Sequence, residues 1–318
     1  MESYKGTKTG AYRKGSETVF GRKHKRGAAG LSFTTPYFTL PKFTYFKPKK
    51  LEDALSLLRQ YKGKAKVMAG GIMLVNLMKE RQIFPEYVID IKGIEELKKI
   101  SKTENGIKIG SAVTAIELQN SLIVRDNLPA LAKAASYMGD RTLQHTVTIG
   151  GNISVGMPST DGLPALMSMD SLLRIKSQDE ERTIPASELV IGLGRTSLKD
   201  DEMITEIIVP YSSGLKGTYL KLINASEIAI ATVAVSALLK ERKLSVVIGA
   251  IAPRPYYFDH KSLQWKWEAS LSENLKNASE IIGSNVKPMS DAVASSEYRK
   301  EVSKVLAVRA LKEVFGGA

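Results

Sequence analysis

Apolar residues recur along the first half of the chain at two spacings, one typical of helices and one of strands. Leu51, Ala54, Leu55 and Leu58 repeat at helical spacing, which predicts an amphipathic helix. Short β-branched or alternating runs predict strands at 66–69, 88–91 and 107–109, and the alanine-rich stretch 129–138 predicts a helix that begins at a proline. These patterns predict an α+β or mixed α/β fold.

The second half of the chain is richer in strand patterns. Runs at 146–149, 172–176 and 203–209 predict strands, and the runs 229–239 and 244–251 flank a polar turn and predict a hairpin. Two helical stretches close the chain, the last with Val302, Val305 and Leu306 on one face. Pro, Ser and Gly cluster at 212–216, which predicts a boundary before a C-terminal domain at 216–318.

Residues 1–37 have a different composition from the remainder. They contain many glycines, few apolar side chains and eight basic residues, namely Lys5, Lys8, Arg13, Lys14, Arg22, Lys23, Lys25 and Arg26. Such a segment does not support a hydrophobic core, which predicts a basic, flexible tail with order beginning near Phe38. A solvated tail, an arm that docks a partner and a transit peptide are three interpretations of it.

Composition excludes several classes of protein. The 318 residues are 43% hydrophobic, which fits a globular protein of two or three domains, and no apolar run approaches the roughly 20 residues of a membrane span. We therefore expect a soluble, cytoplasmic protein. The chain has no cysteine, so it supplies no thiolate to an iron–sulfur cluster, and its three histidines lack ligand-like spacing. Any cluster chemistry must come from another subunit.

The formal net charge of +13 raises nucleic-acid binding as one hypothesis. The basic residues gather in the tail and on predicted helix faces, and no recognisable nucleic-acid-binding motif is present. Nucleic acid is therefore not among the expected partners. A lysine-rich surface also gives solubility and steers acidic partners.

Two glycine pairs, Gly70-Gly71 and Gly150-Gly151, follow β-branched or apolar runs. Glycine lets backbone N–H groups approach an anion closely and allows left-handed torsions that aim successive N–H groups inward. A tight turn or a strand bulge is the more common explanation of an isolated pair. The G-x-G-x-x-G, G-x-x-x-x-G-K-[ST] and G-x-S-x-G patterns are absent, which disfavours a dinucleotide-binding Rossmann fold, a P-loop and a hydrolase elbow.

The first glycine pair lies in a segment that resembles a family signature. Val67, Met68, Ala69, Gly70, Gly71, Ile72, Met73 and Leu74 are followed by Met78-Lys79 and by the strand-like run 85–91. This arrangement is similar to the A-G-G turn, M-K pair and P-x-x-L-V-D-I strand that begin the flavin domain of the FAD-binding medium subunit of molybdenum hydroxylases, the xanthine dehydrogenase, carbon monoxide dehydrogenase and aldehyde oxidoreductase type.

The resemblance continues from about residue 41 to the C-terminus. The family's T-I-G-G-N turn is matched by Thr148, Ile149, Gly150, Gly151 and Asn152. Asp161, in the segment 158–166, matches an acidic residue that contacts the FAD, and Ile204 matches an apolar flavin-contacting position. Lys221 matches the lysine of a Y-x-K-L motif, and residues 250–255 with Glu297-Tyr298-Arg299 match the C-terminal domain.

The resemblance implies an α+β fold. A two-lobed PCMH-type (vanillyl-alcohol-oxidase-like) FAD-binding domain at 38–212, with lobes at about 38–95 and 96–212, would precede a C-terminal domain of antiparallel sheet plus helices. Both glycine pairs would converge on the FAD diphosphate, Asn152 would lie near phosphate or ribose, and Asp161 would accept from a ribose hydroxyl or a flavin N–H. Lys221 would place a positive charge close to the flavin. No catalytic acid, base or nucleophile is expected.

The implied partners are a large molybdenum-cofactor subunit and a small iron–sulfur subunit, and the implied role is electron transfer through FAD to an external acceptor. The chain departs from the family at three places. Ile72-Met73 replace a polar pair, Gln144 and Val147 replace an arginine and a glycine, and the segment after Lys221 lacks the usual basic residues. These departures leave open an alternative: a structural subunit of the same complex with weakened or lost FAD binding.

Overall fold

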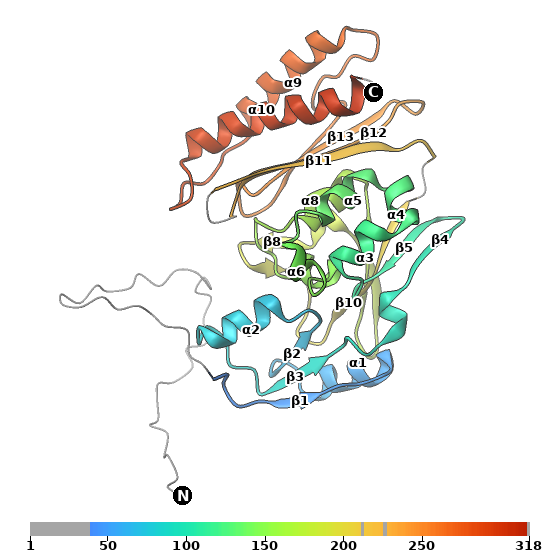
Figure 1. Ribbon diagram of the computed structural model, residues 1–318, viewed down its shortest axis with the longest axis vertical. Helices are drawn as coiled ribbons and strands as arrows, with labels where there is room; N and C mark the ends of the chain where they lie inside the picture. The colour runs from blue at the N-terminus through green and yellow to red at the C-terminus, as the bar shows by residue number, and fades with distance from the viewer. Residues whose placement is uncertain (1–38, 211–212, 225–227, 317–318) are drawn as a thin grey trace, which may run out of the picture. The chain divides into compact units, whose positions relative to one another are not determined.

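A computed structural model describes residues 39–210, 213–224 and 228–316, which belong to one compact unit (Figure 1). The predicted basic tail therefore lies outside the described residues. The predicted boundary at 212–216 is described only from residue 213 onward. Among the described residues, no helix is long and apolar enough to cross a membrane. The described chain contains three main sheets, each with its own helices.

The first sheet is small and parallel, with strand order β1-β3-β2. Its elements are β1 (Thr44–Phe46), α1 (Leu51–Gln60), β2 (Ala65–Met68), α2 (Ile72–Lys79) and β3 (Tyr87–Asp90). The four apolar residues that predicted α1 are all buried against this sheet, which confirms the helical spacing. In α2 only Met78 is buried, although the helix is mostly apolar.

The second sheet has five antiparallel strands in the order β4-β5-β10-β6-β7. These are β4 (Ile100–Thr103), β5 (Gly106–Gly110), β6 (Leu172–Lys176), β7 (Glu181–Pro185) and β10 (Met203–Pro210), with the short hairpin β8 (Val190–Gly192) and β9 (Arg195–Thr196) and the 3-10 turns η1 (Glu95–Lys98) and η2 (Ala186–Glu188). Strand alternation puts Ile107, Ile109 and Leu173 into the core and Lys108 and Arg174 on the opposite, charged face.

Short helices cover the apolar face of this five-stranded sheet. They are α3 (Ala115–Asn120), α4 (Leu122–Asn127), α5 (Pro129–Ala135), α6 (Arg141–Gln144), α7 (Ile149–Ser154) and α8 (Gly162–Ser168). Their buried residues form one hydrophobic cluster with the strands. In α8 every residue is buried, so this helix lies in the interior of the molecule.

The third sheet is an antiparallel meander in chain order, β11 (Lys216–Ile223), β12 (Ala229–Leu238), β13 (Lys243–Gly249) and β14 (Tyr256–Asp259). Helices α9 (Leu271–Asn285) and α10 (Ser296–Phe315) pack on one face of it, and α5 and α8 contact the other (Figure 1). Because β12 is covered on both faces, all of its residues are buried. This explains its continuous apolar run and confirms the predicted hairpin with β13.

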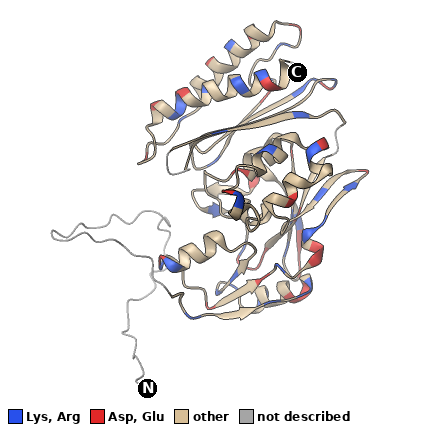
Figure 2. Cartoon of the chain, viewed as in Figure 1, with Lys and Arg blue, Asp and Glu red and all other residues tan. Residues whose placement is uncertain are grey.

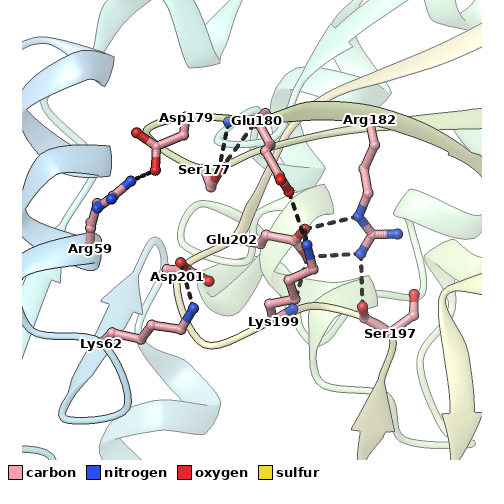
Figure 3. A network of polar contacts seen from close by, with 10 residues as sticks. All are labelled: Arg59, Lys62, Ser177, Asp179, Glu180, Arg182, Ser197, Lys199, Asp201 and Glu202. Atoms are coloured by element: carbon pink, nitrogen blue, oxygen red, sulfur yellow. Dashed lines mark hydrogen bonds and ion pairs between the residues drawn. The ribbon is translucent and has the colours of Figure 1, made fainter.

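The two lobes of the N-terminal region are joined by ion pairs that Figure 3 shows from close by. Arg59 at the end of α1 pairs with Asp179, and the Lys62 Nζ lies 2.8 Å from an Asp201 carboxylate oxygen. Beside them, Glu202 accepts two hydrogen bonds from Arg182, of 2.8 and 2.9 Å. Both acidic and basic residues lie along α10 (Figure 2), so the charge of this helix is partly balanced.

The predicted fold class, α+β with a two-lobed FAD-binding domain and a C-terminal antiparallel sheet with helices, is confirmed. Two local predictions are wrong. Residues 146–149 form no strand, because only Thr148 makes a single β-bridge and α7 begins at Ile149. Val305 is 48% exposed, whereas Val302 and Leu306 are buried, because the buried stripe of α10 runs through Val302, Ser303, Leu306 and Ala307 and Val305 lies beside it.

Candidate functional site

The first glycine pair forms the turn between β2 and α2. Gly70 lies against the 143–146 segment so closely that a Cβ on it would be 2.1 Å from the Thr146 carbonyl oxygen. Gly71 has a left-handed backbone, with φ of +78°, and is the residue that precedes the first turn of α2. Glycine is therefore required at both positions for different reasons, close approach at Gly70 and backbone torsion at Gly71.

The N-terminus of α2 has amide groups available to a ligand. Gly71 offers no side chain to cap the helix, and the N–H groups of a first helical turn have no acceptor within the helix. Met73 is 38% exposed, and the neighbouring residues are half-buried, namely Val67, Met68, Ala69, Gly70, Gly71, Ile72 and Leu74. An N-terminus of this kind attracts anions through its N–H groups and the helix dipole.

The second glycine pair lies inside the first turn of α7, not after a strand. Thr148 is buried, and its Oγ1 caps the helix by accepting a 3.1 Å hydrogen bond from the Gly151 N–H. The Gly150 N–H donates to the Ser111 carbonyl at 2.9 Å, and a Cβ at Gly150 would lie 2.6 Å from the Ser111 Cβ. Ile149 is buried beneath this turn. Gly150 therefore permits close packing of α7 on the end of β5.

The structure brings the two glycine pairs together although 80 positions separate them. A Cβ added to Gly151 would lie 3.9 Å from the Ala69 Cβ, and Gly70 contacts Thr146 two residues before the capping Thr148. The side-chain oxygen of Asn152 accepts a hydrogen bond from the Gly162 N–H at 2.9 Å. This bond ties α7 to α8, so the Asn152 oxygen has a structural partner.

Asp161 and Lys221 form a buried ion pair. The Lys221 Nζ lies 2.9 Å from each carboxylate oxygen of Asp161 and also donates to the Tyr137 carbonyl at 3.2 Å. The Lys221 side chain is 9% exposed, so Lys221 is not a surface lysine at a strand end. The structure thus places the two predicted charged residues against each other.

Tyr219 completes this cluster, and the sequence analysis missed it. Its hydroxyl donates a 2.7 Å hydrogen bond to Asp161. Residues two apart on a strand point to the same side, so Tyr219 and Lys221 of β11 both reach Asp161 from one face. The Y-x-K spacing was the signal that would have found it.

Burial governs the proton affinities in this cluster. It raises the pKa of Asp161 above its usual 3.8, and the opposing effects of Lys221 and Tyr219 do not fully compensate. It also raises the pKa of Tyr219, which the neighbouring Asp161 carboxylate raises further, so Tyr219 remains a hydrogen-bond donor.

Ile204 and Gln144 both make contacts within the protein that the sequence does not reveal. Ile204 of β10 is buried in the same hydrophobic cluster as Ile149, so its predicted contact with flavin stays a prediction. Gln144 donates to the carbonyls of Ser136 and Gly139 and accepts from Gln119, at 2.9 to 3.0 Å. It therefore fixes the 136–144 loop rather than offering a side chain to a ligand.

A cavity of about 180 Å³ lies elsewhere, on the charged face of the five-stranded sheet. Its lining includes Lys108, Arg174 and Glu206, and none of the predicted site residues lines it. The glycine turns, with their uncapped helix and close backbone approach, remain the better candidate for a nucleotide.

The fold and the comparisons together define a flavoprotein with an FAD-binding domain followed by a C-terminal domain. Residues 41–212 match the FAD-binding domain found in molybdopterin dehydrogenases, and residues 220–314 match the C-terminal domain of carbon monoxide dehydrogenase flavoproteins. The chain therefore belongs to the FAD-binding medium subunits of the molybdenum hydroxylase family, and it is an oxidoreductase subunit with FAD as its cofactor.

The matches to individual relatives extend over nearly the whole length of each relative. The nicotinate dehydrogenase FAD-subunit of Eubacterium barkeri is 31% identical over 86% of this chain and 98% of its own length. The glyceraldehyde dehydrogenase medium chain of Sulfolobus acidocaldarius is 28% identical over 86% and 99% of the two chains. Among solved structures, a chain of reconstituted CO dehydrogenase from Oligotropha carboxidovorans is 25% identical, with a TM-score of 0.82 over 88% of this chain and 100% of that one.

The residues present fit the diphosphate part of FAD. A Cβ at Gly70 would meet the Thr146 carbonyl and a Cβ at Gly151 would meet the Thr148 Oγ1, so the two turns pack this closely only as glycines. The amides at the N-terminus of α2 supply donors suited to a diphosphate, because phosphate oxygens are hydrogen-bond acceptors with negative charge.

Proposed function

We propose that this chain transfers electrons from iron–sulfur clusters of a small partner subunit, through FAD, to an external acceptor, within a complex whose large subunit carries the molybdenum cofactor. When bound, FAD supplies the redox chemistry. The chain itself has no cysteine, so the clusters would belong to the partner. The observation that carries the proposal is the approach of the two glycine pairs, Gly70-Gly71 and Gly150-Gly151, beside the uncapped N-terminus of α2.

In this proposal the backbone does most of the diphosphate binding. The N–H groups at Gly70, Gly71 and the first turn of α2 donate to phosphate oxygens, and the helix dipole favours the negative charge. The residues around the turn shape the site, namely Val67, Met68, Ala69, Ile72, Met73 and Leu74. The second turn, from Thr148 to Asn152, closes the other side and keeps its shape through the Thr148 cap.

Asp161 and Lys221 would orient the remainder of FAD. Ionised carboxylate oxygens accept more than one hydrogen bond each, so Asp161 keeps acceptor capacity beside Lys221 and Tyr219. The charge of Lys221 is largely compensated by Asp161, so its influence on the flavin is weaker than that of an unpaired lysine. Ile204 is proposed as an apolar contact of the ring.

The first experiment is an absorbance spectrum and FAD titration of the purified chain, compared with Gly151→Ala. The added Cβ would lie 2.8 Å from the Thr148 Oγ1 and face Ala69, so it disturbs the cradle. We expect a bound flavin in the unchanged chain and an affinity at least about 10-fold lower in the variant, which corresponds to about 1.4 kcal/mol. Gly192→Ala is the control, because its Cβ would meet only the Arg195 Cδ, at 3.9 Å.

Either of two results would contradict the binding proposal: equal FAD affinity in Gly151→Ala and the unchanged chain, or an equal loss in the Gly192→Ala control. Electron transfer needs the complete complex. After rapid mixing with its substrate, the iron–sulfur absorbance should bleach with or before the flavin band. If the complex were active but its flavin absorbance did not change when substrate was added, electrons would bypass this chain.

The second candidate function is a structural subunit with weakened FAD binding. The observation that favours it is the first turn of α2, where Ile72 and Met73 present apolar side chains in place of the family's polar pair. Restoring that pair as Ile72→Thr with Met73→Ser should raise FAD affinity about 5-fold, the gain from roughly 1 kcal/mol of net hydrogen bonding. An unchanged affinity, already tight before substitution, would dismiss this candidate. A cytoplasmic location stays a prediction.

A further inference from the structure

Arg299 is a large side chain that is fully buried, 1% exposed, in the first turns of α10. Its Nη1 donates to two backbone carbonyls, that of Ile230 at 2.6 Å and that of Ala250 at 2.7 Å. Its Nη2 donates to both carboxylate oxygens of Asp291, each at 2.8 Å. One guanidinium group therefore joins three segments that are far apart in sequence.

The Ala250 carbonyl belongs to a residue that also contacts the FAD-binding domain. Ala250 has a left-handed backbone, with φ of +64°, which a residue with a Cβ rarely adopts. Its N–H donates to the Pro158 carbonyl at 3.0 Å, three residues before Asp161. The preceding Gly249 packs so closely that a Cβ would lie 2.7 Å from the Pro164 Cγ. Ala250 thus holds the segment that carries Asp161.

The Ile230 carbonyl belongs to the strand that neighbours Lys221. Ala231 of β12 pairs with Leu222 of β11, and Thr232 pairs with Lys221 itself. A shift at Ile230 would pass through this register to Lys221, because ladder hydrogen bonds fix neighbouring strands together. The Ala250 carbonyl is thus connected to the segment of Asp161, and the Ile230 carbonyl is connected to the strand that pairs with Lys221. Both carbonyls accept from the Arg299 Nη1.

We propose that Arg299 is a positioning residue for the Asp161–Lys221 ion pair, which it holds from behind by tying the Ala250 and Ile230 carbonyls to one nitrogen. The assignment of a flavin role to that pair rests on the proposed function, but the positioning itself concerns only contacts within this chain. Arg299 does not touch the pair, and it acts through the 158–161 segment and through strands β11 and β12.

An arginine is needed here because of its shape. The planar guanidinium directs one nitrogen at two carbonyls while the other nitrogen engages a carboxylate, and a lysine ammonium does not reproduce this fork. Among the described residues, the Arg299 Nε has no hydrogen-bond partner. An unsatisfied buried donor costs stability, which the hydrogen bonds of the other two nitrogens offset.

The test measures how accessible Lys221 is in the chain without FAD. The purified chain is treated with formaldehyde and a borohydride, and methylation of each lysine is followed by peptide mass spectrometry. In Arg299→Lys we expect Lys221 to be methylated about 10-fold faster than in the unchanged chain, as expected from losing one charge-assisted hydrogen bond. Lys133, already 38% exposed, should not change.

Ser303→Ala is the matched control. Ser303 is fully buried one turn further along α10, and its hydroxyl donates to the Arg299 carbonyl at 2.7 Å and not to the carbonyls of Ile230 and Ala250. A general loosening of α10 would expose Lys221 equally in Ser303→Ala and Arg299→Lys, and that result would overturn the proposal, as would unchanged labelling in Arg299→Lys. A rise confined to Arg299→Lys supports it.

A second readout connects the inference to the cofactor. With FAD bound, Arg299→Lys should shift the visible flavin absorption spectrum, whereas Ser303→Ala should leave it as in the unchanged chain. An identical spectrum in all three proteins would show that the pair is not positioned relative to flavin by Arg299. If no protein bound FAD, the proposed function would fail while the methylation result would still decide the positioning of Lys221.

Discussion

Asp161 and Glu202 are two buried carboxylates of the FAD-binding domain whose pKa values are shifted in opposite directions. Each pairs with a basic side chain and accepts at least one further hydrogen bond. Burial raises the pKa of Asp161 above 3.8, beyond what Lys221 and Tyr219 offset. Burial also acts to raise the pKa of Glu202, but Arg182 and the Lys199 N–H outweigh it, and the pKa falls below its usual 4.5.

The difference follows from the partners. Glu202 receives two hydrogen bonds from a planar guanidinium that is itself fixed on the Ser197 carbonyl, as Figure 3 shows, and a third from the Lys199 N–H. Asp161 receives one ammonium and one neutral phenol. Glu202 therefore stabilises the turn before β10, whereas burial of the ionised Asp161 carboxylate costs folding free energy. Costs of this kind are typical of functional sites.

The largest effect should come from Arg182→Met, which leaves Glu202 buried without its main partner. Removing one member of a buried ion pair destabilises a protein by about 3–5 kcal/mol, and we expect about 3 because the Arg182 side chain is one-third exposed (33%). Urea unfolding followed by circular dichroism measures the loss. Arg182→Lys is the control and should lose less, since the charge remains; equal losses would mean that the planar fork alone matters.

The next prediction concerns pH. Glu202 binds its proton less tightly when folded, so it stabilises the fold above pH 4.5 and loses this contribution as pH falls through its folded pKa. Asp161 binds its proton more tightly when folded, so its contribution is present below pH 3.8 and is lost as pH rises through its raised pKa. The free energies of unfolding of Glu202→Gln and Asp161→Asn are compared with the unchanged chain by urea unfolding from pH 3 to 7.

Relative to the unchanged chain, Glu202→Gln should therefore become less stable as pH rises across that range, and Asp161→Asn should become more stable. Curves that slope the same way would remove the distinction between the two carboxylates.

A smaller effect is expected for Tyr219→Phe. This change removes the 2.7 Å hydrogen bond to Asp161 and keeps the packing of the ring, so the fold should lose about 1 kcal/mol in thermal unfolding. The Asp161 pKa should rise further, because one group that favours its ionised form is gone. A loss above about 3 kcal/mol would mean that the phenol anchors more than this one carboxylate.

The smallest effect is expected at the exposed edge of the network in Figure 3. The Lys62 side chain is 55% exposed, although that of its partner Asp201 is only 17% exposed, so Lys62→Met should change the unfolding free energy by less than about 1 kcal/mol. The same assay in 0.5 M salt should reduce the difference further. A larger loss would show that the two lobes depend on this ion pair.

Local patterns in the sequence predicted the elements whose burial is regular. Helix α1 has one buried face and β12 is buried on both, so each leaves a clear pattern of apolar residues. Residues 146–149 look like a strand but become a helix cap, because the Thr148 side chain and the close fit of Gly150 on Ser111 decide the backbone there. Propensity is overridden by contacts that the local sequence does not contain.

The sequence named most residues of the candidate site, but not the contacts between them. The resemblance named Asp161 and Lys221 separately, and no local pattern shows that residues 60 positions apart bond to each other. Gln144 was noted only as a departure from the family, yet it bridges two carbonyls and Gln119 in a loop beside the site. Long-range pairing of this kind depends on how the three sheets pack.

The complete burial of α8 has a consequence for how the two domains are inherited. This helix contributes to the core around the five-stranded sheet and also contacts β12 and β13 of the C-terminal sheet. A chain cut after Pro210 would leave the apolar side of α8 in water, where it would promote aggregation. Recombination that replaced only the C-terminal sheet would need a matching surface on α8, so the two domains should evolve as a single inherited unit.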